Sequence, residues 1–170
     1  MSGINQSINN SKAPKKVNFW IRAAVYAAVY AALTFLIAPL SYGVMQIRFA
    51  EALVVFALFD PAAVYGLGAG CFIANLIGPN GIWDILIGTL ASIAGLIIIR
   101  ALKKHPFAGM LFHVLINGTA IGLMLHFVYG IDIHPAIAIL WITAGEALSC
   151  MGLGLPLLAI LKKRRKDLGL

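Results

Sequence analysis

The sequence predicts an all-α integral membrane protein with six membrane-spanning helices. Of its 170 residues, 61% are hydrophobic and 11% are charged, whereas soluble domains carry roughly 25% charged residues. A bilayer core of about 30 Å needs roughly 20 apolar residues per helix, so the apolar stretches can be counted as spans. The formal net charge is +7, and we assign it to a membrane surface rather than to nucleic-acid binding because the basic residues lie beside the apolar stretches.

Residue pairs that disfavour helix continuation, such as Asp60-Pro61 and His134-Pro135, separate the apolar stretches. The expected spans cover residues 19–37, 48–59, 61–77, 82–99, 107–129 and 135–161. The second is too short to cross a bilayer unaided, so we expect it to continue into the Asp60-Pro61 turn or to lie tilted beneath a loop. This divides the chain into a disordered cytoplasmic lead (1–18), a six-helix membrane domain (19–161) and a basic cytoplasmic tail (162–170).

An even number of spans places both ends of the chain on one side of the membrane. All but one of the thirteen Lys and Arg residues fall on that side. They are Lys12, Lys15, Lys16, Arg22, Arg100, Lys103, Lys104, Lys162, Lys163, Arg164, Arg165 and Lys166. Because cytoplasmic loops carry an excess of basic residues, we expect both termini in the cytoplasm. Arg48 is the exception, and a charge this costly to place near a membrane calls for a specific partner or ligand.

Charged and amide side chains are rare inside the spans, and the topology gathers most of them toward the outer side. Four lie at the outer ends of the second, third and fourth spans, and two reach a similar depth near mid-membrane in the fifth and sixth. We therefore predict a substrate cavity that is open to the outside. Its rim is Arg48, Glu51, Asn75 and Asp84, and its floor is Asn117 and Glu146.

Simpler explanations exist for some of these charges. Arg48 and Glu51 are three residues apart on the expected helix and can pair with each other at the interface. Asp84 can cap or charge-complement the start of a helix. Glu146 has no such explanation, because it lies inside an apolar helix, and we expect it to contact substrate or an ion.

Aromatic and histidine side chains near the cavity allow two interpretations. Trp83 adjoins a carboxylate and Tyr42 lies in the loop before Arg48, so each can stack on a planar ligand; membership of an aromatic belt is the alternative. His113 shares a helix face with Asn117 and is interpreted as a packing or pore-lining residue.

The first span carries small residues four apart on two adjacent stripes, a pattern that lets another helix approach closely. The stripes consist of Ala23, Ala27 and Ala31, and of Ala24, Ala28 and Ala32. Packing inside the bundle and docking on a partner protein are equally open explanations.

The sequence contains no phosphate-binding loop of the GxxxxGK[ST] type, no HExxH and no GxSxG, so we expect neither an ATPase nor the commonest hydrolytic machinery. Gly66-x-Gly68-x-Gly70 resembles the opening of a dinucleotide fingerprint, but it lies in a membrane span without a βαβ unit, and we discard it. Cys71 and Cys150 show neither disulfide nor metal spacing. We expect no cofactor and no metal, and a binding protein whose energy comes from a partner.

Several spaced motifs identify a family. They are Ala38-Pro39-Leu40-Ser41-Tyr42-Gly43, Gln46-Ile47-Arg48, Glu51-Ala52-Leu53, Gly70-Cys71, Ala74-Asn75-Leu76, Gly81-Ile82-Trp83-Asp84-Ile85, Gly88-Thr89-Leu90-Ala91, Gly145-Glu146-Ala147 and Gly154-Leu155-Pro156. In this order, from residue 38 onward, they resemble the QueT family, the substrate-binding S-components of energy-coupling factor (ECF) transporters.

The resemblance implies a six-helix S-component of the bacterial plasma membrane that captures a queuosine precursor, a deazaguanine base such as 7-aminomethyl-7-deazaguanine, from outside. It also implies a transmembrane coupling subunit and two cytoplasmic ATPases that power uptake, with the alanine stripe as the docking face. Glu146, Asp84, Glu51, Asn75 and Asn117 would accept hydrogen bonds from the guanine-like ring. Neither histidine of the fifth span receives a role from the resemblance.

Two other classes of function remain as alternatives. One is a self-sufficient proton-coupled carrier or channel that uses Glu146 and Asp84 as its relay. The other is a membrane enzyme in which Ser149 or Cys150 acts with His113.

Overall fold

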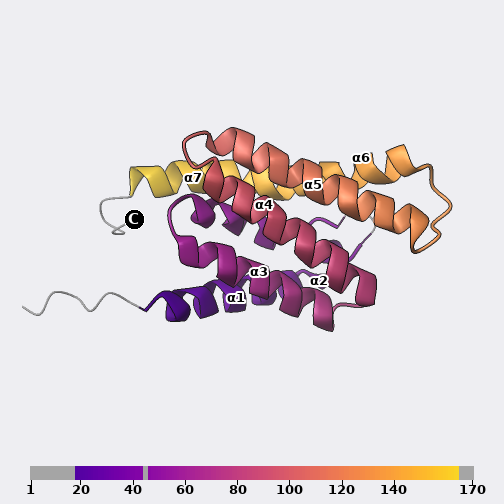
Figure 1. Ribbon diagram of the computed structural model, residues 1–170, viewed down its shortest axis with the longest axis horizontal. Coiled ribbons are helices and arrows are strands. Elements are labelled where there is room, and N and C mark those ends of the chain that lie inside the picture. Colours follow the sequence, from indigo (N-terminus) through magenta and orange to yellow (C-terminus); the bar gives the residue numbers. More distant parts are fainter. Residues whose placement is uncertain (1–17, 44–45, 165–170) are drawn as a thin grey trace, which may run out of the picture.

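The computed structural model describes residues 18–43 and 46–164, and every regular element in that part of the chain is a helix. The elements are α1 (Phe19–Leu36), α2 (Ala38–Ser41), η1 (Phe49–Leu58), α3 (Pro61–Ile77), η2 (Asp84–Gly88), α4 (Thr89–Ala101), α5 (Pro106–Phe127), α6 (Pro135–Glu146), η3 (Ala147–Leu153) and α7 (Gly154–Lys163). The long helices lie side by side along one axis of the molecule (Figure 1). Most of the predicted lead and tail, residues 1–17 and 165–170, lies outside the described residues.

Six apolar helical stretches occupy the positions expected for the spans. Four are long and apolar enough to cross a membrane, at Phe19–Leu36, Asp84–Ala101, Pro106–Phe127 and Pro135–Lys163. The other two, Phe49–Leu58 and Pro61–Ile77, are shorter. The all-helical, multi-pass membrane architecture is thus confirmed, while the number of six crossings stays a prediction.

The short second stretch, η1, is a 3₁₀ helix of ten residues at the centre of the bundle. Its rise of about 2.0 Å per residue extends it over roughly 20 Å, about 5 Å more than the same residues would cover as an α-helix. With three residues per turn, Leu53, Phe56 and Phe59 share one partly exposed face while the positions between them are buried. Backbone hydrogen bonds from Phe59 and Asp60 to Phe56 continue the turn to Asp60, as one of our two expectations had it. The other, a segment tilted beneath a loop, stays a prediction.

Close contact between α1 and α3 explains the glycine run that resembled a dinucleotide fingerprint. A Cβ atom at Gly66 would lie 2.3 Å from the carbonyl oxygen of Ala23, and one at Gly70 would lie 2.8 Å from that of Ala27. Glycines four apart therefore let the two helix backbones approach, as small residues do in membrane bundles.

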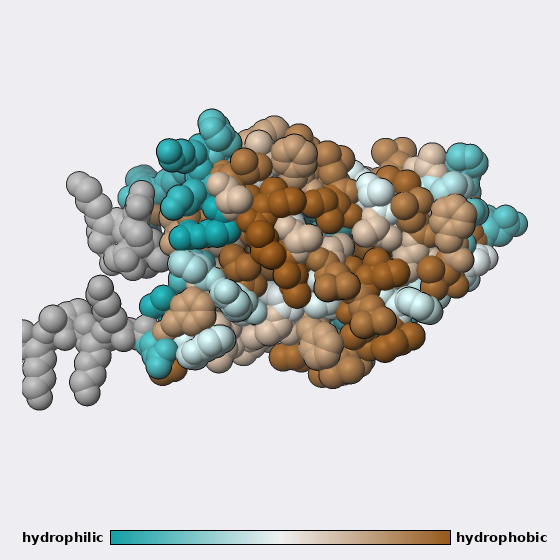
Figure 2. Space-filling view, in the orientation of Figure 1, coloured by the Kyte–Doolittle hydropathy of each residue, from teal (hydrophilic) through white to brown (hydrophobic). Residues whose placement is uncertain are grey.

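The start of the first helix and the end of the last helix lie at the same end of the bundle. α1 begins there and α7 ends there (Figure 1), and hydrophilic side chains gather there in the space-filling view (Figure 2). Asp60 links α3 to α1 at this end. Its carboxylate accepts a hydrogen bond from the backbone N–H of Ala62 at 2.9 Å, and this contact caps α3. It also accepts from Arg22 Nε at 2.9 Å. We call this the basic end and the opposite one the loop end.

Candidate functional site

A cluster of charged and amide side chains lies buried inside the bundle. Each member has at most 1% of its surface exposed, although the elements that carry them are far apart in sequence. The polar cluster consists of Arg48 and Glu51 from the start of η1, Asn75 from α3, Asp84 from η2, His113 and Asn117 from α5, and Glu146 from α6. All six residues predicted for the rim and floor are therefore brought together, and His113 joins them.

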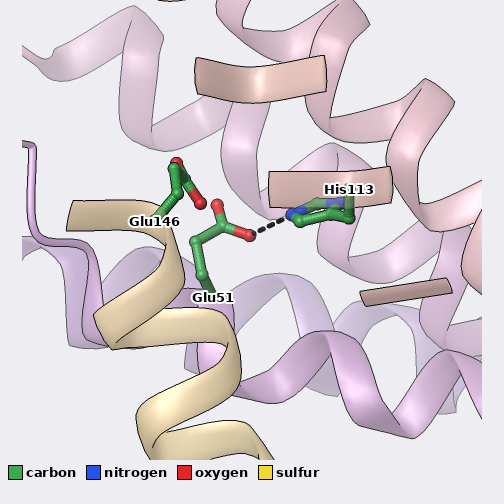
Figure 3. A group of neighbouring side chains, drawn as sticks. All are labelled: Glu51, His113 and Glu146. Atoms are coloured by element: carbon green, nitrogen blue, oxygen red, sulfur yellow. Dashed lines mark hydrogen bonds and ion pairs between the residues drawn. The ribbon is translucent and has the colours of Figure 1, made fainter. Parts of the chain in front are cut away.

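Glu51 is the centre of one half of the polar cluster. Its Oε2 lies 2.9 Å from His113 Nε2, and its Oε1 accepts a short hydrogen bond from the Tyr30 hydroxyl of α1. The carboxylate of Glu146 points toward that of Glu51 from the neighbouring helix (Figure 3). Two carboxylates and an imidazole thus face one another in a site without solvent contact.

Arg48 and Asp84 form the other half. Arg48 Nη2 donates to Asp84 Oδ2 at 3.1 Å, and Arg48 Nε donates to the carbonyl of Ser41 at 3.4 Å. The alternative that Arg48 pairs with Glu51 is therefore wrong, because each has a different ionic partner. Asp84 also does not cap a helix, since the helical turn begins two residues earlier, at Ile82.

Amide and hydroxyl groups connect the two halves. Asn75 Nδ2 donates to the carbonyl of Asp84 at 3.1 Å. On the Glu51 side, Ser92 Oγ donates to Asn117 Oδ1 at 3.1 Å, and Asn117 Nδ2 lies 3.4 Å from His113 Nε2. Cys71 Sγ, 3.5 Å from both Asn75 Nδ2 and Ser92 Oγ, closes the chain of contacts.

Several buried polar atoms of the cluster have no hydrogen-bond partner among the described residues: Glu146 Oε2, Asp84 Oδ1, Asn75 Oδ1 and His113 Nδ1. The amide oxygen of Asn75 can only accept, and the carboxyl oxygens of Glu146 and Asp84 accept when these groups are ionised. Most buried polar atoms in proteins are satisfied, so a group of unsatisfied acceptors is a functional feature to explain. A molecule rich in N–H donors would satisfy them.

The cluster also holds more carboxyl groups than basic groups. Arg48 balances one of the three carboxylates, which leaves Glu51 and Glu146 facing a single imidazole. Ligand atoms of Glu51, His113 and Glu146 all lie within 4.8 Å of one another, so this trio could hold a cation. A metal-binding histidine normally donates its second ring N–H to an orienting partner. His113 Nδ1 has none within residues 18–43 and 46–164, so the donor set fits an organic cation better than a metal ion.

An open cavity of about 350 Å³ lies at the loop end. Its lining includes Tyr42, Gln46, Asn80 and Tyr129 from three connecting segments and Leu125 from the last turn of α5. The expectation that Arg48, Glu51, Asn75 and Asp84 rim this open cavity is wrong, because all four are buried. The polar cluster is closed.

Gln46 is a further candidate that sequence reasoning did not single out. It lines the loop-end cavity, its side chain is buried, and its Oε1 has no partner among the described residues. Its φ of 45° lies in the left-handed region, which a side chain other than glycine adopts at a cost. Strain of this kind clusters at ligand-binding segments.

The two aromatic candidates differ in their surroundings. Tyr42 lines the loop-end cavity, its ring centroid lies 5.8 Å from the Arg48 guanidinium carbon, and its hydroxyl donates to the Ala74 carbonyl at 2.6 Å. Burial raises the pKa of the Tyr42 phenol above its usual 10, which keeps it a donor. Trp83 is 47% exposed and does not line that cavity, so the aromatic-belt interpretation suits it better.

The alanine stripes of α1 divide cleanly. Ala23, Ala27 and Ala31 are buried inside the bundle, and Ala23 and Ala27 meet the glycines of α3. They serve internal packing. Ala24, Ala28 and Ala32 are exposed along the outer face of the helix, so this second stripe is the one that a partner could reach.

Comparison with known protein families decides the assignment. A family model described as QueT transporter matches residues 20–163. The chain belongs to the QueT transporter family. No curated protein and no solved structure was found to match it. Membership identifies a membrane transport protein and implies a small-molecule substrate. Of the residues named in the enzyme alternative, Ser149 donates to the carbonyl of Gly145, and His113 contacts Glu51.

Proposed function

We propose that this QueT transporter protein is a six-span S-component that binds a cationic deazaguanine, such as 7-aminomethyl-7-deazaguanine, for ATP-driven import. One observation carries the choice of ligand. The polar cluster has unsatisfied acceptors at Glu146, Asp84 and Asn75 and an excess of carboxylates. A guanine-like ring offers several N–H donors. An aminomethyl group adds a positive charge that can pair with the carboxyl groups of Glu51 and Glu146.

The loop-end cavity is the proposed entrance. Its volume of about 350 Å³ is within the range of small-molecule sites, about 300–1,000 Å³. Tyr42 both lines the cavity and contacts Arg48, so its side chain lies between the entrance and the polar cluster. Ligand entry would require the Tyr42 side chain to move, which leaves its ring available to stack on a flat ligand.

The proposed topology puts the basic end in the cytoplasm of a bacterial cell and the loop end outside. The positive-inside rule supports this direction. The sequence carries no phosphate-binding motif, so the proposal assigns ATP hydrolysis to partner subunits. A transmembrane coupling subunit would dock on the exposed stripe of Ala24, Ala28 and Ala32, whose small side chains allow close helix approach.

Calorimetric titration of the purified chain in detergent tests the ligand. We expect saturable binding of 7-aminomethyl-7-deazaguanine, at least tenfold weaker binding of the neutral 7-cyano analogue, weak binding of guanine and none of thiamin. Equal affinity for the aminomethyl and cyano forms would contradict the charge argument. If a folded sample binds none of them, the titration is repeated on the chain co-purified with its partners, and a second negative result rejects deazaguanines as the ligand.

A self-sufficient proton-coupled carrier is the second candidate, and the facing carboxylates of Glu51 and Glu146 favour it (Figure 3). Asp84, the other expected relay group, is held by Arg48 at 3.1 Å, which disfavours free proton exchange there. Reconstitution of the chain alone separates the two. Accumulation of labelled deazaguanine driven by a proton gradient would establish the carrier, whereas the S-component should bind ligand and accumulate none.

A further inference from the structure

We propose that a groove at the basic end binds the headgroup of an anionic phospholipid. The groove has a volume of about 500 Å³ and lies between the ends of η1 and α4, the start of α5 and the last turns of α7. Its lining combines the cations Arg100, Lys103, Lys104 and Lys162 with apolar side chains that include Leu58 and Leu158. We call it the basic groove. It is separate from the polar cluster and from the loop-end cavity.

Positive charge in the basic groove is not neutralised by the described residues. Among the described residues, the carboxylate at this end is that of Asp60, and it forms an ion pair with Arg22, which is outside the groove lining. Arg100 is held in place, since its Nη1 donates to the carbonyls of Ala57 and Leu58 at 3.4 and 3.1 Å. Lys103, Lys104 and Lys162 are exposed. Four cations without an acidic partner in the described part of the chain attract an anion.

The start of α5 adds to this attraction. Pro106, the first residue of this 22-residue helix, lines the basic groove. The backbone N–H groups and the dipole at a helix N-terminus favour negative charge, phosphate above all. Three independent features, a groove, four cations and a helix start, therefore point to one phosphate-sized anion.

Apolar surface beside the cations indicates a lipid rather than a free phosphate. Leu58 and Leu158 form part of the groove wall. Ile97, one turn before Arg100 on the outer face of α4, is 55% exposed, where acyl chains of the same leaflet would lie. Basic pockets between membrane helices are suited to anionic headgroups for this reason.

Native mass spectrometry of the delipidated full chain provides the test. It is titrated with phosphatidylglycerol and, separately, with phosphatidylcholine of the same acyl chains. We expect at least fivefold tighter binding of phosphatidylglycerol. The double variant Lys103→Gln/Lys162→Gln should lose about tenfold in phosphatidylglycerol affinity and lose the preference.

The control variant Lys163→Gln/Arg164→Gln removes the same charge from the end of α7 and its adjoining residue, at positions that do not line the groove, and should stay within twofold of the wild type. An equal loss in this control would show diffuse attraction and overturn the proposal, as would equal binding of the two lipids. Soluble glycerol 3-phosphate is the third arm: displacement of phosphatidylglycerol at equal concentration would mean a free phosphate site instead. Circular dichroism confirms that each variant is folded.

Discussion

Two arginine–aspartate pairs join helices in this bundle, and they differ in every respect that bears on function. Arg22 and Asp60 meet at the basic end, where the two side chains are 40% and 8% exposed. The arginine uses two nitrogens, Nε at 2.9 Å and Nη2 at 3.3 Å. The other oxygen contacts of Asp60 come from Ala62 N–H and the Tyr26 hydroxyl. Both carboxylate oxygens are satisfied.

Arg48 and Asp84 meet inside the bundle, where their side chains are 2% and 0% exposed. A single contact at 3.1 Å joins Arg48 to Asp84 Oδ2, and Asp84 Oδ1 has no partner among the described residues. The more costly environment therefore has the less complete pairing. An ion pair that only held helices together would be satisfied, as Arg22–Asp60 is, so we interpret the open acceptor of Asp84 as part of a ligand site.

Removal of the buried arginine should cause the largest loss of unfolding free energy. Arg48→Met leaves the Asp84 carboxylate uncompensated in an apolar interior, which costs about 3–5 kcal/mol of unfolding free energy. Unfolding by dodecyl sulfate titration in mixed micelles measures it. The double variant Arg48→Met/Asp84→Leu should recover most of the loss because the isolated charge is gone. A loss below about 1 kcal/mol for the single variant would contradict the interpretation of this pair as buried and dry.

The second-largest loss of unfolding free energy should come from a side chain at residue 95 that clashes with His113. A Cβ atom at Gly95 would lie 2.1 Å from His113 Nδ1, so the ring has its position only because residue 95 is glycine. Gly95→Ala should cost about 1–3 kcal/mol through overpacking and should weaken ligand binding by moving the imidazole away from Glu51. Gly152→Ala is the control, since its Cβ would meet Leu148 at an ordinary 3.5 Å. Equal ligand affinity in wild type and Gly95→Ala would separate His113 from the binding site.

Glu146→Gln tests the unsatisfied acceptors directly. We expect ligand affinity to fall by more than tenfold, about 1.4 kcal/mol, while stability is retained or improved because a buried, unpartnered carboxylate oxygen becomes neutral. Calorimetry and dodecyl sulfate titration on the same samples give both quantities. Asp132→Asn makes the same kind of change at an exposed site near the loop end and should alter neither. Unchanged affinity in Glu146→Gln would assign Glu146 to packing or assembly.

Much of this contrast could be predicted from the sequence, because rare charges in apolar stretches are conspicuous. Arg48, Glu51, Asp84 and Glu146 were all expected in one site, and all lie in the polar cluster. Their partners were not predictable in the same way. The alternative pairing of Arg48 with Glu51 assumed that both residues lie in one helix, whereas Arg48 precedes η1 in an extended conformation, with φ −98° and ψ 97°, and contacts to other helices decide the partners.

The other features of the polar cluster that the sequence did not predict depend on tertiary contacts, which cannot be read from one sequence. His113 was interpreted as a packing or pore-lining residue, and only the spacing of four residues to Asn117 indicated a shared polar face. Tyr30 lies in the alanine-rich helix, where nothing local marks it as a partner of Glu51. The π-helical turns η2 and η3, which reorient the backbone at Asp84 and just after Glu146, have no simple sequence signal. The bulky residues Leu53, Phe56 and Phe59 did carry a period of three.

The smallest loss of unfolding free energy is expected for the Arg22–Asp60 pair, whose carboxylate oxygens are both satisfied. Arg22→Met removes an ion pair that is partly exposed to solvent, and such pairs contribute about 0.2–1 kcal/mol. Asp60 keeps its hydrogen bonds from Ala62 and Tyr26, so the cap of α3 survives. The difference from wild type should shrink further at high salt, which screens charges near water but not those inside the bundle. Measured beside Arg48→Met over a salt series, this variant shows whether burial sets the strength of the two pairs: similar losses, with similar salt dependence, would mean that water reaches Arg48 and that the polar cluster is open.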